Sequence, residues 1–117
     1  MGKNNNVTKL AFTGSTKLTL SAMKAIIDLD NYEIVGLFGL SNEALLEKVN
    51  SVKMDNFCKN NKIILDKSHD WNSFHSFCLE RSVDMIITLG DSRIIPKQIV
   101  NNFEVIGNHG AILPYVQ

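Results

Sequence analysis

A nearly continuous apolar run, Tyr32-Glu33-Ile34-Val35-Gly36-Leu37-Phe38-Gly39, lies in the first third of the 117-residue sequence. Strands that have helices packed on both faces carry such runs, because neither side of the sheet meets water. Residues 32–39 therefore predict a strand of a parallel sheet that is buried between two layers of helices.

Strand and helix patterns alternate on both sides of this run. Short apolar stretches predict the other strands at 7–13, 62–65, 83–89 and 103–107. Apolar residues at helical spacing predict helices from about 17 to 28–31, at 42–60 with a break near 50–53, at 70–81 and at 96–101. This order predicts an α/β fold: a doubly wound, Rossmann-like and mostly parallel sheet with helices on both faces.

Polar side chains and a proline mark where the helices begin. Thr16 or Thr19 can cap the first helix, and Asp70 or Ser68 the helix at 70–81, because their oxygens accept a hydrogen bond from a free N–H of the first turn. Pro96 suits a first helical turn, where its missing N–H would have no partner. The apolar residues of the 70–81 helix share one face, namely Trp71, Phe74, Phe77 and Cys78.

The composition is that of a globular chain, with 44% hydrophobic and 21% charged residues, and the length is that of one domain. Twelve Lys and Arg residues balance twelve Asp and Glu residues, which argues against broad electrostatic binding to nucleic acid or to an anionic membrane. No apolar run reaches the roughly 18–20 residues that span a bilayer. The polar start, Met-Gly-Lys-Asn-Asn-Asn, has no signal-peptide character, so a cytoplasmic protein is expected.

The two cysteines, Cys58 and Cys78, form no C-x-x-C pair, and no histidine stands at zinc-finger spacing from them. Both fall in segments with helical or mixed patterns. Buried free thiols in a reducing compartment are favoured over a disulfide or a metal site.

Ligands of doubly wound sheets bind beyond the carboxyl ends of the strands, so the turns that follow the strands are the places to search. Gly14-Ser15-Thr16-Lys17 joins a strand to a helix, where backbone N–H groups can hold a phosphate or a carboxylate. The segment matches neither G-x-G-x-x-G nor G-x-x-x-x-G-K-[ST]. A plain tight turn is therefore favoured over an anion site, and both stay open.

Asn108-His109-Gly110 follows the last predicted strand directly. An imidazole with a pKa of about 6.5 can donate a proton or a hydrogen bond near neutral pH. An adjacent amide can orient it or help to hold a developing oxyanion. A structural loop histidine is the alternative.

Three other polar side chains are candidates of lower interest. Arg93 can bind an anionic ligand through its fork of donors, or it can form a surface salt bridge. His69 is interpreted as a loop residue and His75 as solvent-facing. Nothing in the spacing of these two with His109 favours a metal site.

Three segments stand in order along the chain: Leu10-Ala11-Phe12-Thr13-Gly14-Ser15, then Met85-Ile86-Ile87-Thr88-Leu89-Gly90 with Ile94-Ile95-Pro96-Lys97, then Val105-Ile106-Gly107-Asn108-His109-Gly110-Ala111-Ile112-Leu113-Pro114. Together they resemble the formyltransferases that use 10-formyltetrahydrofolate. The first resembles that family's first strand and turn, the second its folate-side strand and the helix start that follows, and the third its catalytic stretch. Members of the family formylate methionyl-tRNA, glycinamide ribonucleotide or sugar amines.

The resemblance implies a reaction and the residues that serve it. An acceptor amine attacks the formyl carbon of 10-formyltetrahydrofolate, and His109, with Asn108 beside it, stabilises the negative charge on the oxygen. No metal is implied. The acceptor is the amine of a sugar, an aminoacyl-tRNA or a glycinamide-type compound. The residues implied in binding the folate are Leu89, Gly90, Arg93, Ile94, Ile95, Gly110, Ala111 and Leu113.

The chain departs from the family pattern in two respects. The family's Asn stands two residues before the His, where this chain has Gly107, and the Gly-x-His form looks more like the sugar-amine branch. The family's catalytic Asp follows further along, whereas this chain stops at Gln117. Residues 1–117 are therefore expected to be the N-terminal, folate-binding part of a catalytic domain, incomplete after the fifth strand and inactive alone.

Two other functions stay open. The absent Asp and the shifted Asn also suit a non-catalytic, Rossmann-like ligand-binding or regulatory module. A nucleotide-dependent enzyme of the doubly wound class would bind its nucleotide at residues 14–17. Neither a membrane nor nucleic acid in general is expected as a partner, a tRNA acceptor remains among the candidates, and the oligomeric state is left open.

Overall fold

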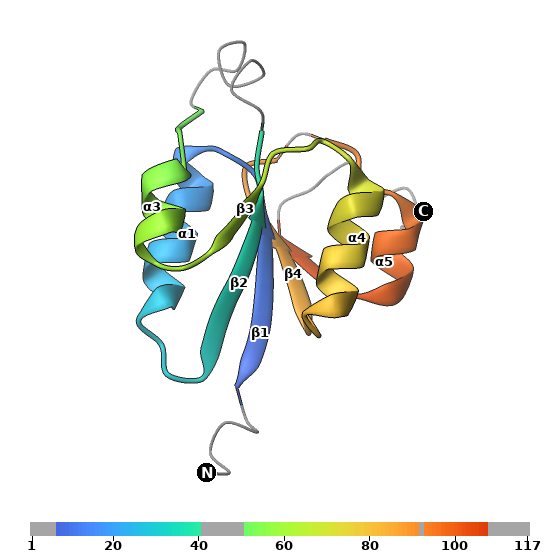
Figure 1. Ribbon diagram of the computed structural model, residues 1–117, viewed down its shortest axis with the longest axis horizontal. Coiled ribbons are helices and arrows are strands. Elements are labelled where there is room, and N and C mark those ends of the chain that lie inside the picture. The colour runs from blue at the N-terminus through green and yellow to red at the C-terminus, as the bar shows by residue number, and fades with distance from the viewer. Residues whose placement is uncertain (1–6, 41–50, 92, 108–117) are drawn as a thin grey trace.

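The computed structural model describes residues 7–40, 51–91 and 93–107. The five predicted strands and four of the predicted helical segments are present in these ranges, most of them one or two residues shorter than predicted (Figure 1). The elements are β1 (Thr8–Thr13), α1 (Lys17–Ile27), β2 (Tyr32–Phe38), α3 (Asp55–Asn60), β3 (Ile64–Asp66), α4 (Trp71–Glu80), β4 (Met85–Thr88), α5 (Lys97–Asn102) and β5 (Glu104–Gly107). Of the helix predicted over 42–60, residues 41–50 lie outside the described ranges, and only α3 is seen.

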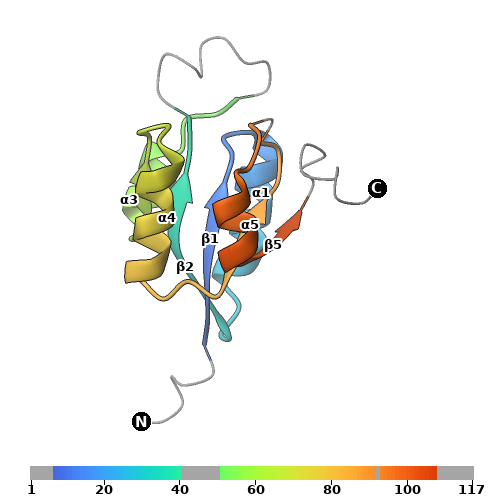
Figure 2. The ribbon, with the colours of Figure 1, turned by 90° about the vertical axis from the view of Figure 1, so that its right-hand side faces the viewer.

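All strands of the sheet are parallel, in the order β3-β2-β1-β4-β5. This is the order of the first five strands in Rossmann-type sheets. The prediction of a parallel, doubly wound sheet is confirmed. Figure 2 shows β5 at one edge of this sheet.

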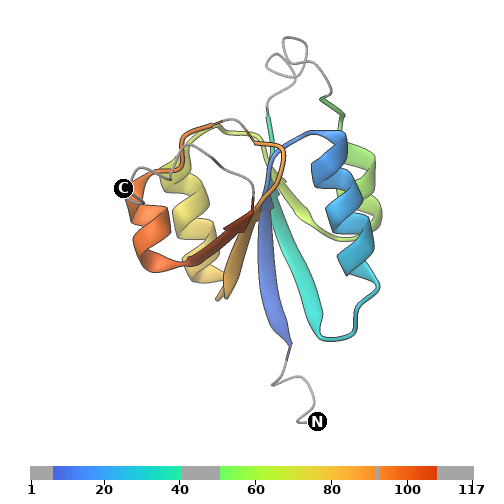
Figure 3. The same cartoon turned by 180° about the vertical axis from the view of Figure 1, so that it is seen from behind.

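Helices cover both faces of the sheet: α1 and α3 pack on one face, and α4 and α5 on the other (Figures 1 and 3). Successive side chains of a strand point to opposite faces. In β1, Leu10 and Phe12 pack with Met23 of α1, while Ala11 packs with Phe74 of α4. Both faces therefore have an apolar core, which is why the strand sequences read as nearly continuous apolar runs.

The face of α4 that was predicted to be apolar packs on β2. Phe38 stacks on Phe74 with ring centroids 4.7 Å apart and lies against Trp71 at 4.6 Å. Gly36 lets the helix approach closely, because a Cβ at this position would lie 2.5 Å from the Phe77 ring. A glycine inside β2 is thus explained by the close contact between helix and strand.

Both predicted caps are present. Thr16 and Thr19 form a reciprocal capping box at the start of α1. The Oδ1 of Asp70 accepts a hydrogen bond from the backbone N–H of Asn72 at 2.9 Å, at the start of α4. Pro96 stands at the cap position of α5, one residue before the helix, and not inside its first turn as predicted.

Both cysteines are free and buried, as predicted. Cys58 belongs to the core beneath α1 and α3, and Cys78 to the core beneath α4 and α5, so the sheet separates the two thiols.

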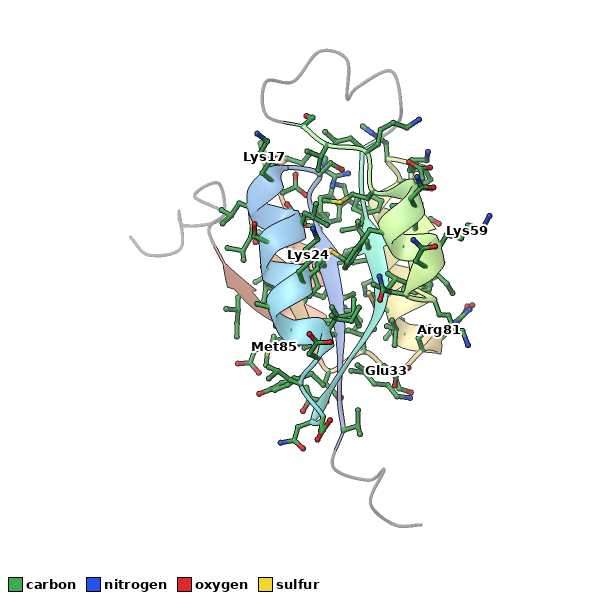
Figure 4. The ribbon with its side chains drawn as sticks, turned by 90° about the vertical axis from the view of Figure 1, so that its left-hand side faces the viewer. Lys17, Lys24, Glu33, Lys59, Arg81 and Met85 are labelled. Carbon is green, nitrogen blue, oxygen red and sulfur yellow. The ribbon has the colours of Figure 1, made fainter. Side chains whose placement is uncertain are left out.

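Lys17, Lys24 and Lys59 are exposed on the outer side of α1 and α3 (Figure 4). In the described part of the chain, no helix is both long and apolar enough to cross a bilayer.

Candidate functional site

The carboxyl ends of β1, β2 and β4 lie next to one another along one end of the sheet, which we call the sheet edge from here on. After β1 the chain continues to β2 on one side, and β4 pairs with β1 on the other. In open α/β sheets this change of direction is where ligands bind. The edge brings together the turn at residues 14–16, the end of β2, and the connection between β4 and α5. We use "β4–α5 connection" for residues 89–91 and 93–96, since Ser92 lies outside the described residues.

The first turn is closed by contacts within the protein. Gly14 donates its N–H to the carbonyl of Phe38 at 3.1 Å. Thr16 and Thr19 satisfy each other's backbone N–H groups, and the Thr19 hydroxyl donates to the carbonyl of Leu89. These contacts support the plain tight turn over an anion site at residues 14–17.

The β4–α5 connection lies directly against this turn (Figure 3). Gly90 has a φ of +73°, and a Cβ there would lie 2.0 Å from Oγ1 of Thr16. Gly14 has a φ of +123°, and its Cβ would lie 2.7 Å from the carbonyl oxygen of Leu89. Only glycine tolerates both the positive φ and the close approach. Gly90, predicted as a folate-binding residue, thus has a packing role that the sequence did not reveal.

Arg93 is held inside the protein by its neighbours. Its Nε donates to Oδ1 of Asp91 at 2.9 Å, and its Nη2 donates to Oδ2 at 2.7 Å. Nη2 also donates to the carbonyl of Phe38 at 2.7 Å, and Nη1 to that of Gly39 at 3.3 Å. The side chains of Arg93 and Asp91 are only 14% and 4% exposed, so the salt bridge predicted on the surface is largely buried.

The pKa of the Asp91 carboxyl lies below its usual value. Burial acts to raise this pKa, but the hydrogen bonds and the positive charge of Arg93 outweigh that effect. Asp91 is therefore ionised at neutral pH, and a charged pair stands at the edge of the sheet.

The two adjacent isoleucines predicted to bind folate differ in exposure. Ile94 is 72% exposed and offers its side chain to solvent at the sheet edge. Ile95 is 6% exposed and belongs to the core beneath α4 and α5. Leu89 is half-buried, with its carbonyl oxygen engaged by Thr19. Of these three side chains, that of Ile94 is the one most open to a ligand.

The remaining predicted site residues lie outside the described residues: Asn108, His109, Gly110, Ala111 and Leu113. The residue before them, Gly107, ends β5 and is the Cα partner of Thr88 in β4. Gly107 has a φ of +134°, and a Cβ there would lie 2.1 Å from the carbonyl oxygen of Thr88. No asparagine fits this backbone, which gives a physical reason for glycine where the resembled family has its Asn.

The other two histidines lie away from this edge or in its loops. His69 is a loop residue with a φ of +64°, as predicted. His75, predicted to face solvent, is half-buried instead, because α5 covers it: its ring packs edge-on against Phe103 at 5.7 Å, and its Nε2 lies 3.0 Å from Nδ2 of Asn102. Among the described residues there is no group of three or more His, Cys, Asp or Glu side chains placed to hold a metal ion.

Sequence reasoning missed that Asp91 is the partner of Arg93. It also missed that the side chains of Thr13 and Thr88 are buried next to each other at the strand ends. The Asp-x-Arg spacing was the available signal for the pair, since both residues fall in one short turn. Thr13 and Thr88 are Cα partners at the ends of β1 and β4, and both are fully buried. Two threonines in strand ends carry no sequence signal of their own.

No model of a known protein family matches the chain, and no curated protein matches it. The pattern of the residues and the geometry of the sheet edge therefore carry the functional proposal.

Proposed function

We propose that residues 1–117 are the folate-binding part of a formyltransferase, which passes a formyl group from 10-formyltetrahydrofolate to an amine. One observation supports this most directly. Thr88 and Gly107 are Cα partners in neighbouring parallel strands. The two strands that precede the folate-side loop and the catalytic stretch in the resemblance therefore end side by side, at the edge where such sheets bind ligands.

In this proposal, one set of residues binds the folate and another stabilises the charge that forms during transfer. Ile94 and the backbone of the β4–α5 connection bind the pterin ring, since an apolar wall with a few polar backbone groups suits a flat heteroaromatic ring. The acceptor nitrogen bonds to the formyl carbon, the bond from that carbon to the folate nitrogen breaks, and the amine proton replaces it on the folate. His109 stabilises the negative charge on the formyl oxygen during this exchange.

Ligand binding is the first test. Calorimetry of the chain with 10-formyltetrahydrofolate, and separately with ATP and NAD, should give heat only with the folate. Ile94→Asp should weaken folate binding by about tenfold or more, because a charge would replace the apolar wall. Leu79→Asp is the matched control, since Leu79 is 57% exposed on α4 and should leave binding unchanged. Binding of ATP or NAD in place of folate would overturn the proposal.

Turnover is the second test, and it is made in the full natural protein that carries this region. His109→Ala should lower turnover by about 10²–10⁴-fold, the usual contribution of a positioned proton donor. His75→Ala is the control, because it also removes an imidazole but from the flank of α4. Near-normal transfer by His109→Ala would remove the catalytic role. Folate binding without any transfer by the full wild-type protein would favour a non-catalytic ligand-binding module.

A further inference from the structure

We propose that Asp91 and Arg93 form a clasp that fixes the β4–α5 connection, so that Arg93 positions the ligand-binding loop and does not itself contact the ligand. The identity of the ligand in this inference rests on the proposed function, whereas the clasp itself does not. Arg93 would otherwise be the natural candidate for an anionic group of the folate, because a guanidinium pairs well with carboxylates.

Arg93 has no donor nitrogen left without an acceptor in the protein. Nε and Nη2 hold the two oxygens of Asp91 in a paired, fork-to-fork arrangement. Nη1 and Nη2 donate to the carbonyls of Gly39 and Phe38. The guanidinium carbon also lies 4.4 Å from the ring centroid of Phe38 and 5.4 Å from that of Trp71. The group is therefore bound along its edges and stacked on aromatic rings.

Swinging Arg93 out toward a ligand would break all of these contacts. It would also leave the Asp91 carboxylate without a cation, in a side chain that is only 4% exposed. A buried charge that loses its partner is strongly unfavourable. Arg93 is thus committed to the interior, where it ties the β4–α5 connection to the end of β2 and to Trp71 at the start of α4.

The clasp explains why an isoleucine is presented to solvent. Ile94 lies between Arg93, which the clasp holds, and Ile95, which is anchored in the core. Its exposed fraction of 72% is the largest among the large hydrophobic side chains of the described residues. At the β4 end of the connection, the Thr19 hydroxyl donates a hydrogen bond to the carbonyl of Leu89, and Gly90 lies against Thr16. A loop pinned at both ends presents its apolar side chain in a fixed geometry, which is what a preorganised binding site requires.

Arg93→Lys is the decisive variant. A lysine keeps the charge and the ion pair with Asp91, so the chain should still fold, but it lacks the planar fork that reaches both carbonyls and stacks on the rings. Two readouts apply. Trp71 is the only tryptophan in the sequence, and the Arg93 guanidinium stacks on its ring. In Arg93→Lys without ligand, the fluorescence emission of Trp71 should therefore shift to the red and be quenched more by acrylamide. Affinity for 10-formyltetrahydrofolate in calorimetry should fall by about ten- to a hundredfold, as expected when binding groups are displaced.

Two further variants separate positioning from general stability. Asp91→Asn/Arg93→Gln removes both charges together, so that neither is left unpaired, and it should give the same two changes. Cys58→Ala removes a buried side chain from the core on the opposite face of the sheet. It should lower stability while keeping wild-type affinity and emission.

Several results would overturn the clasp. Wild-type affinity in Arg93→Lys or in the double variant would do so, and so would an equal loss of affinity in Cys58→Ala. Weaker binding with unchanged Trp71 emission in the free protein would show instead that Arg93 touches the ligand. A wild-type chain that binds no folate would overturn the proposed function alone, and the Trp71 emission of Arg93→Lys would then decide the clasp by itself.

Discussion

Asp91 keeps its negative charge although its side chain is almost completely buried. This makes the free energy of unfolding depend on pH. Its pKa in the folded protein is lower than in the unfolded chain, where an aspartate titrates near 3.9. The stabilisation is thus fully present above about pH 5 and is lost as the pH falls through 4 toward the folded pKa.

Asp91→Asn should therefore be less stable than the wild type at pH 7, by up to about 3–5 kcal/mol, because Arg93 would lose its anion. The difference should shrink as the pH falls from about 5 to about 3. Urea unfolding at a series of pH values measures it. Asp55→Asn is the control: the Asp55 pKa is also lowered, chiefly by its hydrogen bond to Lys67, but the pair is 43% and 28% exposed. It should cost under about 1 kcal/mol at any pH. A constant difference for Asp91→Asn would contradict the prediction.

Gly90 is the second residue with a sharp requirement. Gly90→Ala should lower the free energy of unfolding by about 1–3 kcal/mol through its positive φ alone, and the contact with Thr16 should add to this loss. Gly39→Ala is the matched substitution, because Gly39 has no positive φ. A Cβ there would lie 3.0 Å from Oγ of Ser15, against 2.0 Å from Oγ1 of Thr16 at Gly90. It should change stability by no more than about 1 kcal/mol. Equal losses in denaturant unfolding would refute the role of Gly90.

Among the elements, α4 supplies most of the aromatic side chains in the core on its own face of the sheet, so a loss of its cap should be felt in stability. Asp70→Ala should cost about 1 kcal/mol, since the N–H of Asn72 would lose its acceptor. Ser76→Ala, at an exposed position in the same helix, should be neutral or slightly stabilising. Thermal unfolding compares the two, and a cap variant as stable as Ser76→Ala would show that the cap contributes nothing.

The elements were predictable because their signals are local. Apolar runs located the strands, helical spacing gave the face of α4, and single side chains indicated the caps of α1 and α4. The start of β3 was missed because Lys62 has a φ of +59° and ends the turn before the strand. The helix over 42–60 was seen only in part, as α3.

The site was less predictable, because its geometry depends on contacts between distant residues. The sequence indicated the β4–α5 connection but not that Arg93 bonds to carbonyls at Phe38 and Gly39. It also treated Ile94 and Ile95 alike, although one lies in solvent and the other in the core. That difference depends on how the loop is held, which no local pattern reports.

The two cores should behave as one cooperative unit, since β1 contributes side chains to both. The thiols can report this. Burial and the nearby Asp55 raise the pKa of Cys58 to about 11, and burial and Asp66 raise that of Cys78 to about 12. Neither thiol should react with a disulfide reagent in the folded protein, because the reactive thiolate is absent.

Cys58→Ala and Cys78→Ala each leave one thiol, so the two faces can be followed separately. Corrected for the stability of each variant, the labelling rates should rise with urea in the same way, as two-state unfolding requires. Rapid labelling of one thiol in the absence of denaturant would show that its face opens independently.

The strand order also has a consequence for how the protein is made. Of the strands in this sheet, β1 leaves the ribosome before the others, yet one of its two neighbours, β4, comes more than seventy residues later. The bond from the N–H of Lys9 to the carboxylate of Asp84 spans this separation. The half-sheet β3-β2-β1 can assemble first, with one edge of β1 left unpaired until β4 emerges. At usual synthesis rates this takes on the order of one to four seconds after β3 is complete. During that interval the nascent chain presents an apolar strand edge, which is the part of the molecule a chaperone would have to shield.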